Sequence, residues 1–259
     1  MKISVSDKFI YGLIVSLAIG LLMAAYAGSQ EQSPVVIDPA AVAEDPALPT
    51  LNFMYGRTDL RVVNEGPHEE FGTVQAFLEP PGAGKLMVGD DEFTLLRFHW
   101  HIPSEHELPA KEFPMEMHLV HHFIDAAGQE QLLVVGVWIE QGRRNRELDK
   151  IFAKLPQLKE EEREVRFFNL ARLLPNDISS FRYDGSLTTP TSDAPFEPFR
   201  EGVKWIVLKK PIQMSARQIR AFGRLFLPES NDRDTQPLGD RVVLTEPAEE
   251  PPDDMDDES

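Results

Sequence analysis

Short runs of apolar and β-branched residues, separated by Gly, Pro and Asp, recur along most of this chain after residue 30. The clearest of them are LRVVN, FGTVQAFL, TLLRFHWHI, MEMHLVHHF and QLLVVGVWIE. Runs of this length and composition are typical of β-strands. The pattern therefore predicts a β-rich fold. With 259 residues, 42% of them hydrophobic, the chain is long enough to form one sizeable core in a single domain.

Two segments predict helices. Residues 145–155 carry apolar side chains at helical spacing. In residues 215–226, Ser215 and Gln218 form a capping box ahead of an apolar helical face. Since both segments are short, the predicted class is β-rich α+β, with helices at the periphery of a sheet.

The two ends of the chain differ from its middle. Residues 1–27 have a lysine-bearing start, an apolar run and an A-x-A arrangement at Ala25 and Ala27, which predicts a signal peptide or an uncleaved membrane anchor. Either would place the domain, residues 28–245, in the periplasm or outside the cell. Residues 246–259 hold eight acids and no base, and we expect this tail to be disordered.

Composition excludes several classes of function. The chain has 43 acidic and 26 basic residues, a formal charge of −17, which would repel nucleic acids and anionic membrane surfaces. A membrane is therefore expected as a partner only through an uncleaved anchor. The chain contains no cysteine, so disulfides and thiolate metal sites are excluded. Any metal must be held by histidines and carboxylates.

The stretch FHWHIPSEH, residues 98–106, places three of the chain's seven histidines close together. On a β-strand, residues two apart point to the same face. Arg97, His99 and His101 therefore share one face. The other face carries large apolar side chains suited to a core, those of Leu96, Phe98, Trp100 and Ile102.

The following run, MEMHLVHHF, places Glu116, His118 and Val120 on one face. If this strand pairs antiparallel with the preceding one, His118 can lie beside His99 and His101. Three imidazoles with an open fourth position are typical of catalytic zinc sites, and Glu116 could accept the second N–H of His118. Ordinary buried or surface histidines remain the alternative interpretation of this spacing.

Four motifs taken together closely resemble the α-class carbonic anhydrases: RFHWHIPSEH, EMHLVHHF, YDGSLTTP and EGVKWIVLKKPI. The resemblance extends in the family's order from Gln32 to Val243. It implies a central, largely antiparallel twisted β-sheet with short peripheral helices. It also implies the reversible hydration of carbon dioxide to bicarbonate and a proton, with Zn²⁺ held by His99, His101 and His118.

The resemblance assigns further roles. Glu105 and Thr188 would orient the attacking oxygen, and Thr189 would line the pocket. Carbon dioxide is apolar and is best bound by an apolar pocket wall that excludes water. The resemblance places five apolar residues in that wall, and ordinary core packing is an equal alternative for each: Val120, Val134, Leu187, Val203 and Trp205.

The chain also departs from the family pattern. Arg97 stands where the family usually has Gln, whose oxygen can accept the N–H of the first zinc histidine, whereas Arg has no acceptor. Pro67 stands where a histidine relays protons, so His68, one residue later, becomes the candidate relay. Residues 191–200 contain an insertion that we expect at the rim of the cleft.

Two other functions are weighed against this one. The first is a catalytically weak or inactive binding module of the same fold, whose signature would be loss of a zinc histidine, and none is lost. The second is a cupin, because His99, His101 and Glu105 also fit the start of a cupin metal motif. A cupin would require a further histidine later in the chain, and no histidine follows His122.

Overall fold

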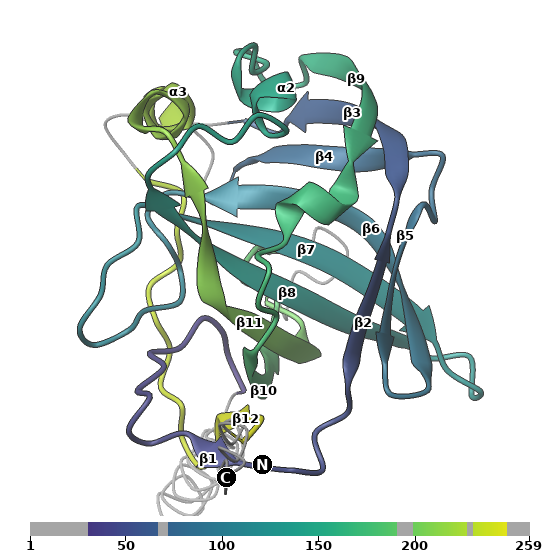
Figure 1. Cartoon of the computed structure of the whole chain (residues 1–259), viewed down its shortest axis with the longest axis vertical. Helices are drawn as coiled ribbons and strands as arrows, with labels where there is room; N and C mark the ends of the chain where they lie inside the picture. Colours follow the sequence, from purple (N-terminus) through teal and green to yellow (C-terminus); the bar gives the residue numbers. More distant parts are fainter. Residues whose placement is uncertain (1–30, 67–71, 191–198, 227–229, 248–259) are drawn as a thin grey trace, which may run out of the picture.

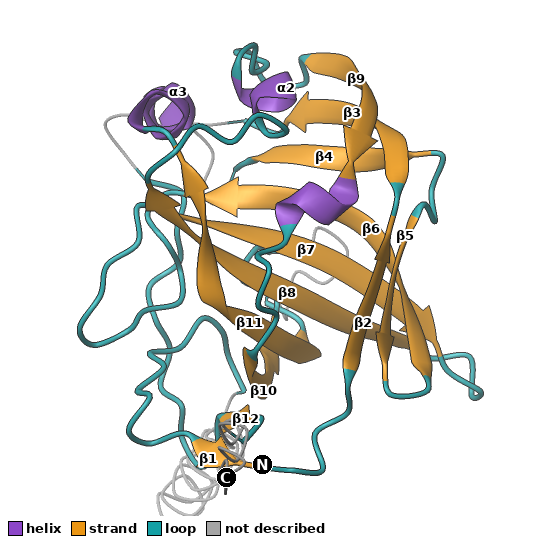
Figure 2. Ribbon diagram, in the orientation of Figure 1, coloured by secondary structure: helices purple, strands orange, loops and turns teal. Residues whose placement is uncertain are grey.

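The computed structural model describes residues 31–66, 72–190, 199–226 and 230–247. Strands dominate these residues and helices are few, as Figure 2 shows, which confirms the predicted class. The predicted leader and most of the acidic tail lie outside the described residues. Within the described part, no helix has the length and apolar character needed to cross a bilayer.

The strands of the described residues join into one 12-stranded sheet. Its main path runs in the order β1-β12-β10-β11-β8-β7-β6-β4-β3-β9, with β5 pairing to β6 and β2 to β5 (Figure 1). The strand bounds are β1 Ala43–Glu44, β2 Leu51–Tyr55, β3 Arg57–Asn64, β4 Val74–Glu79, β5 Gly84–Val88, β6 Asp91–His101, β7 Met115–Ile124, β8 Glu130–Gln141, β9 Glu162–Asn169, β10 Ser180–Ser186, β11 Glu201–Met214 and β12 Leu244–Thr245.

Neighbouring strands are antiparallel at every described pairing except two. β11 runs parallel to β8, and the short β1 runs parallel to β12. The middle of the sheet is formed by β6, β7 and β8, which are joined by antiparallel pairing over most of their length. Their alternating side chains therefore present one row to each face of the sheet.

The larger apolar cluster lies on the face covered by the helices. Trp100 of β6 contacts Phe152 of α2 (Asp149–Phe152) and Phe222 of α3 (Ala216–Phe226), with ring centroids 5.0 and 6.2 Å apart. The two helices lie near one another at one end of the sheet (Figure 1). Residues that alternate with Trp100 along the central strands point to the opposite face, where a smaller cluster surrounds the histidines.

Of the two predicted helices, the second forms as predicted and the first is shorter than predicted. α3 begins directly after Ser215 and has the predicted capping box: Ser215 Oγ accepts from Gln218 N at 3.4 Å, and Gln218 Oε1 accepts from Ser215 N at 3.0 Å. The prediction for residues 145–155 was too long. Asn145 Oδ1 accepts from the backbone N–H groups of two following residues in the turn at residues 146–148, and α2, which follows that turn, contains only four residues.

One facing prediction on β6 was wrong. The pairing of β6 with β7 shifts register between Leu95 and Arg97, which is a β-bulge. The bulge turns Leu95 fully into the core and leaves Leu96 half-buried. Beyond it, Phe98 and Trp100 occupy the core face as predicted. The bulge therefore resets the alternation just before the histidines.

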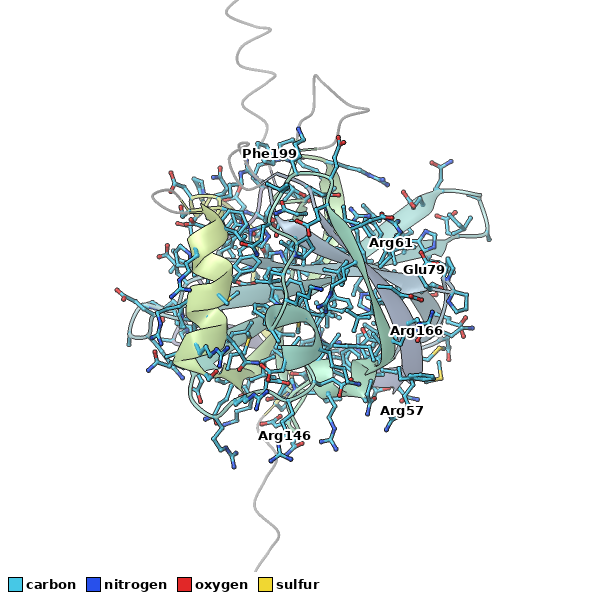
Figure 3. All side chains as sticks on the ribbon, turned by 90° about the horizontal axis from the view of Figure 1, so that it is seen from above. Arg57, Arg61, Glu79, Arg146, Arg166 and Phe199 are labelled. Carbon is cyan, nitrogen blue, oxygen red and sulfur yellow. The ribbon has the colours of Figure 1, made fainter. Side chains whose placement is uncertain are left out.

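The part of the sheet formed by β3 and β4 carries exposed charged side chains. Arg61 of β3 contacts Glu79 of β4, with Nε and Oε1 3.3 Å apart, and Figure 3 shows the two residues near one another. Both side chains are about half exposed, so this ion pair adds little to stability. It covers Phe77, whose ring centroid lies 4.8 Å from the Arg61 guanidinium.

Candidate metal centre

Three histidines from two paired strands meet on the face opposite the helices. β6 and β7 pair antiparallel with His99 directly opposite His118, while His101 lies two residues along β6. One ring nitrogen from each histidine lies within 4.8 Å of those of the other two. The antiparallel pairing of these two strands, which the sequence offered as a condition, therefore forms, and it brings the three imidazoles together.

Burial keeps these imidazoles neutral. His99, His101 and His118 are at most 5% exposed. Burial lowers the pKa of His101 to about 3 and lowers that of His99 well below its usual value. The pKa of His118 is also lowered by burial, although Glu116 opposes that effect. Neutral imidazole is the form that binds a metal ion.

The hydrogen bonds of two histidines set which nitrogen is free. His101 Nδ1 donates to the Asn231 carbonyl at 2.8 Å, and His118 Nε2 donates to Glu116 Oε1 at 2.9 Å. His101 Nε2 is buried and has no hydrogen-bond partner, and the same holds for both ring nitrogens of His99. Buried nitrogen lone pairs without partners are costly unless something occupies them. The arrangement fits a metal ion held by three histidines.

Glu116 organises the surroundings of this cluster. Its Oε2 accepts from the backbone N–H groups of Glu105 and His106 at 3.0 and 2.8 Å, and its Oε1 lies 2.7 Å from His106 Nδ1. Burial alone would raise the pKa of the Glu116 carboxyl, but His106 and His118 hold it below the usual value. The carboxylate is therefore a fixed acceptor for His118.

His106, Tyr183 and Ser33 were not among the predicted site residues. His106 Nε2 lies 2.7 Å from the Tyr183 hydroxyl, which lies 2.9 Å from Ser33 Oγ. This buried series of polar contacts runs from Glu116 through His106 and Tyr183 to Ser33. Its only sequence signal is the third histidine of FHWHIPSEH. Asn231, the acceptor for His101, lies 130 residues away along the chain and gave no signal.

The two predicted orienting residues lie beside the histidines. Glu105 is buried, with Oε1 3.2 Å from His101 Nδ1 and Oε2 3.7 Å from His118 Nδ1. Burial raises the pKa of Glu105, while hydrogen bonds from Thr188 and from the Arg233 backbone N–H act in the opposite direction. Thr188, only 3% exposed, thus lies next to the Glu105 carboxylate.

The residues proposed for a carbon dioxide wall belong to one apolar cluster. Val120 pairs with Val134 across β7 and β8, and Val134 pairs with Trp205 across β8 and β11. The Trp205 ring centroid lies 4.8 Å from that of His118. Val203 and Leu187 belong to the same cluster, and Thr189 follows it as a half-buried residue. This side of the metal centre is therefore walled by apolar groups.

Of the three departures from the family pattern, only Arg97 lies entirely within the described residues. Arg97 is partly buried on β6, where the acidic groups of Glu65 and Glu130 oppose the lowering of its pKa by burial. The relay candidate His68 lies outside the described residues, as does Pro67. The insertion expected at the cleft rim falls largely on residues 191–198, which are also outside them.

Comparison with known proteins agrees with this geometry. The family model for the eukaryotic-type carbonic anhydrase matches residues 22–247. The carbonic anhydrase of Klebsiella pneumoniae is 36% identical over 214 residues, which are 82% of this chain and 79% of that protein. The mitochondrial carbonic anhydrase 5B of Homo sapiens is 32% identical over 244 residues, covering 83% of this chain and 74% of that protein.

Solved structures lead to the same family. The α-carbonic anhydrase of Thermovibrio ammonificans, solved with the inhibitor sulfanilamide, is 34% identical with a TM-score of 0.71, covering 83% of this chain and 87% of that one. The Photobacterium profundum α-carbonic anhydrase is also 34% identical, with a TM-score of 0.70 and coverage of 85% and 92%. The fold, the histidine cluster and these similarities show that this chain belongs to the α-class carbonic anhydrases.

Proposed function

We propose that this carbonic anhydrase binds one zinc ion at His99, His101 and His118 and uses it in the reversible hydration of carbon dioxide to bicarbonate and a proton. The observation that carries the proposal is the set of three buried, neutral imidazoles that lie together, with ring nitrogens of His99 and His101 that have no hydrogen-bond partner. Nitrogen ligands in this number are typical of catalytic zinc sites. When bound, zinc would lower the pKa of a coordinated water to about 7 and so supply a nucleophile at neutral pH.

The chain's own residues would orient that nucleophile. The Thr188 hydroxyl has one proton, and it lies near enough to the Glu105 carboxylate to lower the pKa of Glu105. A hydrogen bond donated to that carboxylate would use the proton. Thr188 Oγ1 is then left as an acceptor only. A water or hydroxide beside the histidines must donate to Thr188 and therefore aims a lone pair elsewhere. Glu105 is itself held by the Arg233 backbone N–H at 2.9 Å.

The substrate would meet this lone pair on the apolar side of the centre. Carbon dioxide offers little to a hydrogen-bond donor, and the neighbouring Val120, Val134 and Trp205 form a dry surface that suits it. Bicarbonate is charged and gains more from water than from these side chains, which favours its release. Contacts among the same three residues across the strands keep the wall rigid.

The test is a metal analysis and a carbon dioxide hydration assay on the purified protein. We expect about one zinc per chain, and we expect His101→Ala to lose both the metal and the activity. His122→Ala is the matched control, because His122 is a neighbouring but partly exposed histidine paired with Glu130. Full activity in metal-free protein would overturn the proposal. Zinc binding without activity would instead favour the inactive binding module.

A further inference from the structure

The three candidate ligands differ in how their second ring nitrogen is held. His101 has the Asn231 carbonyl and His118 has the Glu116 carboxylate. His99 has neither, since both of its nitrogens are buried without a hydrogen-bond partner. A metal ion can occupy only one of the two. The remaining N–H needs an acceptor, because a metal-bound histidine almost always donates its other N–H.

The neighbour on the same strand cannot provide this acceptor. Arg97 shares a face with His99, and its guanidinium has donors only. Its own Nε is buried without a partner, so Arg97 adds an unsatisfied donor to this corner of the site. The next neighbour that could provide an acceptor lies on the adjacent strand.

The adjacent strand carries such a group. Gln75 of β4 pairs directly with His99 of β6. Directly opposed residues of an antiparallel pair point to the same face, with Cβ atoms about 5 Å apart. Gln75 Oε1 is buried and has no hydrogen-bond partner, whereas Gln75 Nε2 donates to Glu65 Oε2. The contact with Glu65 fixes the amide so that its oxygen stays available.

We propose that Gln75 Oε1 accepts the second N–H of His99, with Glu65 holding the Gln75 amide in position. Gln75 is then a positioning residue that acts through His99 and touches neither substrate nor metal. Two buried groups that lack partners, a donor and an acceptor on paired residues, satisfy one another. The inference rests on the proposed function only in requiring His99 to be a metal ligand.

The experiment measures zinc loss from the loaded protein to an excess of a chromophoric chelator. Gln75→Met removes the acceptor while keeping the length of the side chain, and we expect about 10-fold faster zinc loss. Gln131→Met is the matched control, because Gln131 is also a half-buried strand glutamine whose Nε2 donates to a carboxylate, that of Asp125. We expect wild-type zinc loss from this control.

A second variant separates positioning from a general loss of packing. Arg97→Gln places an acceptor on the strand of His99. In the wild-type background we expect little change, within about 2-fold, since Gln75 already serves. Added to Gln75→Met, it should restore most of the lost zinc retention. A merely structural defect at position 75 would not be repaired in this way.

Several results would overturn the inference. Gln75→Met could hold zinc as well as wild type, or Arg97→Gln alone could slow zinc loss about 10-fold, which would mean that His99 lacks an acceptor in the native protein. Imidazole NMR of the zinc-loaded protein gives an independent reading, since the His99 N–H signal should be protected from exchange in wild type and not in Gln75→Met. A wild-type protein that binds no zinc would instead refute the proposed function.

Discussion

At the scale of single residues, the site depends on how hydrogen bonds assign protons. Each imidazole must present a lone pair, and the partner of its other nitrogen decides which atom does so. Asn231 and Glu116 make that choice for His101 and His118. The proposed role of Thr188 rests on the same reasoning, because its single proton would be directed to Glu105.

Removal of either orienting group should leave the metal and reduce the rate. We expect Thr188→Ala and Glu105→Ala to retain zinc and to lose about 10²-fold or more in kcat/KM, because positioning is worth several kcal/mol of activation barrier. Stopped-flow hydration with metal analysis checks this. Thr58→Ala, a buried threonine on β3, is the control. Wild-type rates in both site variants would mean that the orienting roles are misassigned.

The proton leaving the site poses a separate question at this scale. Histidine suits a relay at neutral pH and proline cannot act as one, so His68 is the candidate beside Pro67. We expect His68→Ala to lower kcat, imidazole buffer to restore it, and kcat/KM to stay nearly constant. A high kcat that is independent of buffer concentration in both wild type and His68→Ala would show that another group carries the proton.

At the scale of elements, β8 acts on the metal centre without contributing a ligand. Gly136 of β8 pairs with His118 of β7. A Cβ at position 136 would lie 2.8 Å from Glu116 Oε1, closer than carbon and oxygen tolerate. The bare backbone of this glycine therefore leaves room for the carboxylate that holds His118.

Gly136→Ala should loosen the metal through this contact. The added methyl group displaces Glu116, and we expect about 10-fold faster zinc loss to a chelator. Gly56→Ala is the matched control, because its Cβ would meet nothing within 4 Å. Equal zinc retention in the two variants would mean that Glu116 moves without consequence for His118.

At the scale of the whole molecule, the sheet separates two histidine environments. The metal-site histidines point to one face, while His121, from the same β7, is buried in the opposite core with its Nε2 2.5 Å from the Tyr55 hydroxyl. Burial lowers the pKa of His121 to about 3. The folded protein thus keeps a neutral histidine that the unfolded chain would protonate near its ordinary pKa of about 6.5.

Stability should therefore fall with acidification. The contribution of His121 is complete above about pH 6.5 and is lost between there and about pH 3, because the unfolded state binds a proton that the folded state excludes. We expect a slope of about 1.4 kcal/mol per pH unit from this group. Denaturant titrations should show a smaller slope in His121→Leu. Tyr55→Phe keeps the imidazole and should keep the slope, and identical slopes in His121→Leu and wild type would contradict the assignment.

Export is a further prediction at the scale of the whole chain. We propose that residues 1–27 direct the protein to the periplasm or cell exterior, with or without cleavage. Cell fractionation should find the full chain outside the cytoplasm and residues 28–259 within it. The mass of the exported protein distinguishes a cleaved signal from an anchor. Retention of the full chain in the cytoplasm would contradict the proposal.

Local periodicity determined much of this protein from the sequence alone. Alternation along residues 94–102 and 115–123 indicated two strands and the shared face of three histidines, because side-chain direction in a strand depends only on position. The capping box at Ser215 worked for the same reason, since its two members lie three residues apart. The turn after Asn145 and the bulge beside Leu96 were missed, because neither an irregular turn nor a shift in strand pairing changes the apolar periodicity of the sequence.

Only the tertiary structure decided how His101 is held, whereas Glu116, the acceptor for His118, was predicted from the sequence. The acceptor for His101 comes from Asn231, the polar chain beyond Glu116 ends at Ser33, and Gln75, the proposed partner of His99, lies opposite it on β4. These partners are separated from the histidines by tens of residues or more along the chain. Their meeting depends on strand order, register and loop path, which arise from packing of the whole sheet. The spacing of the sequence therefore placed the candidate ligands on matching strand faces, whereas the distant groups that hold His101 and His106 are brought to them by the fold.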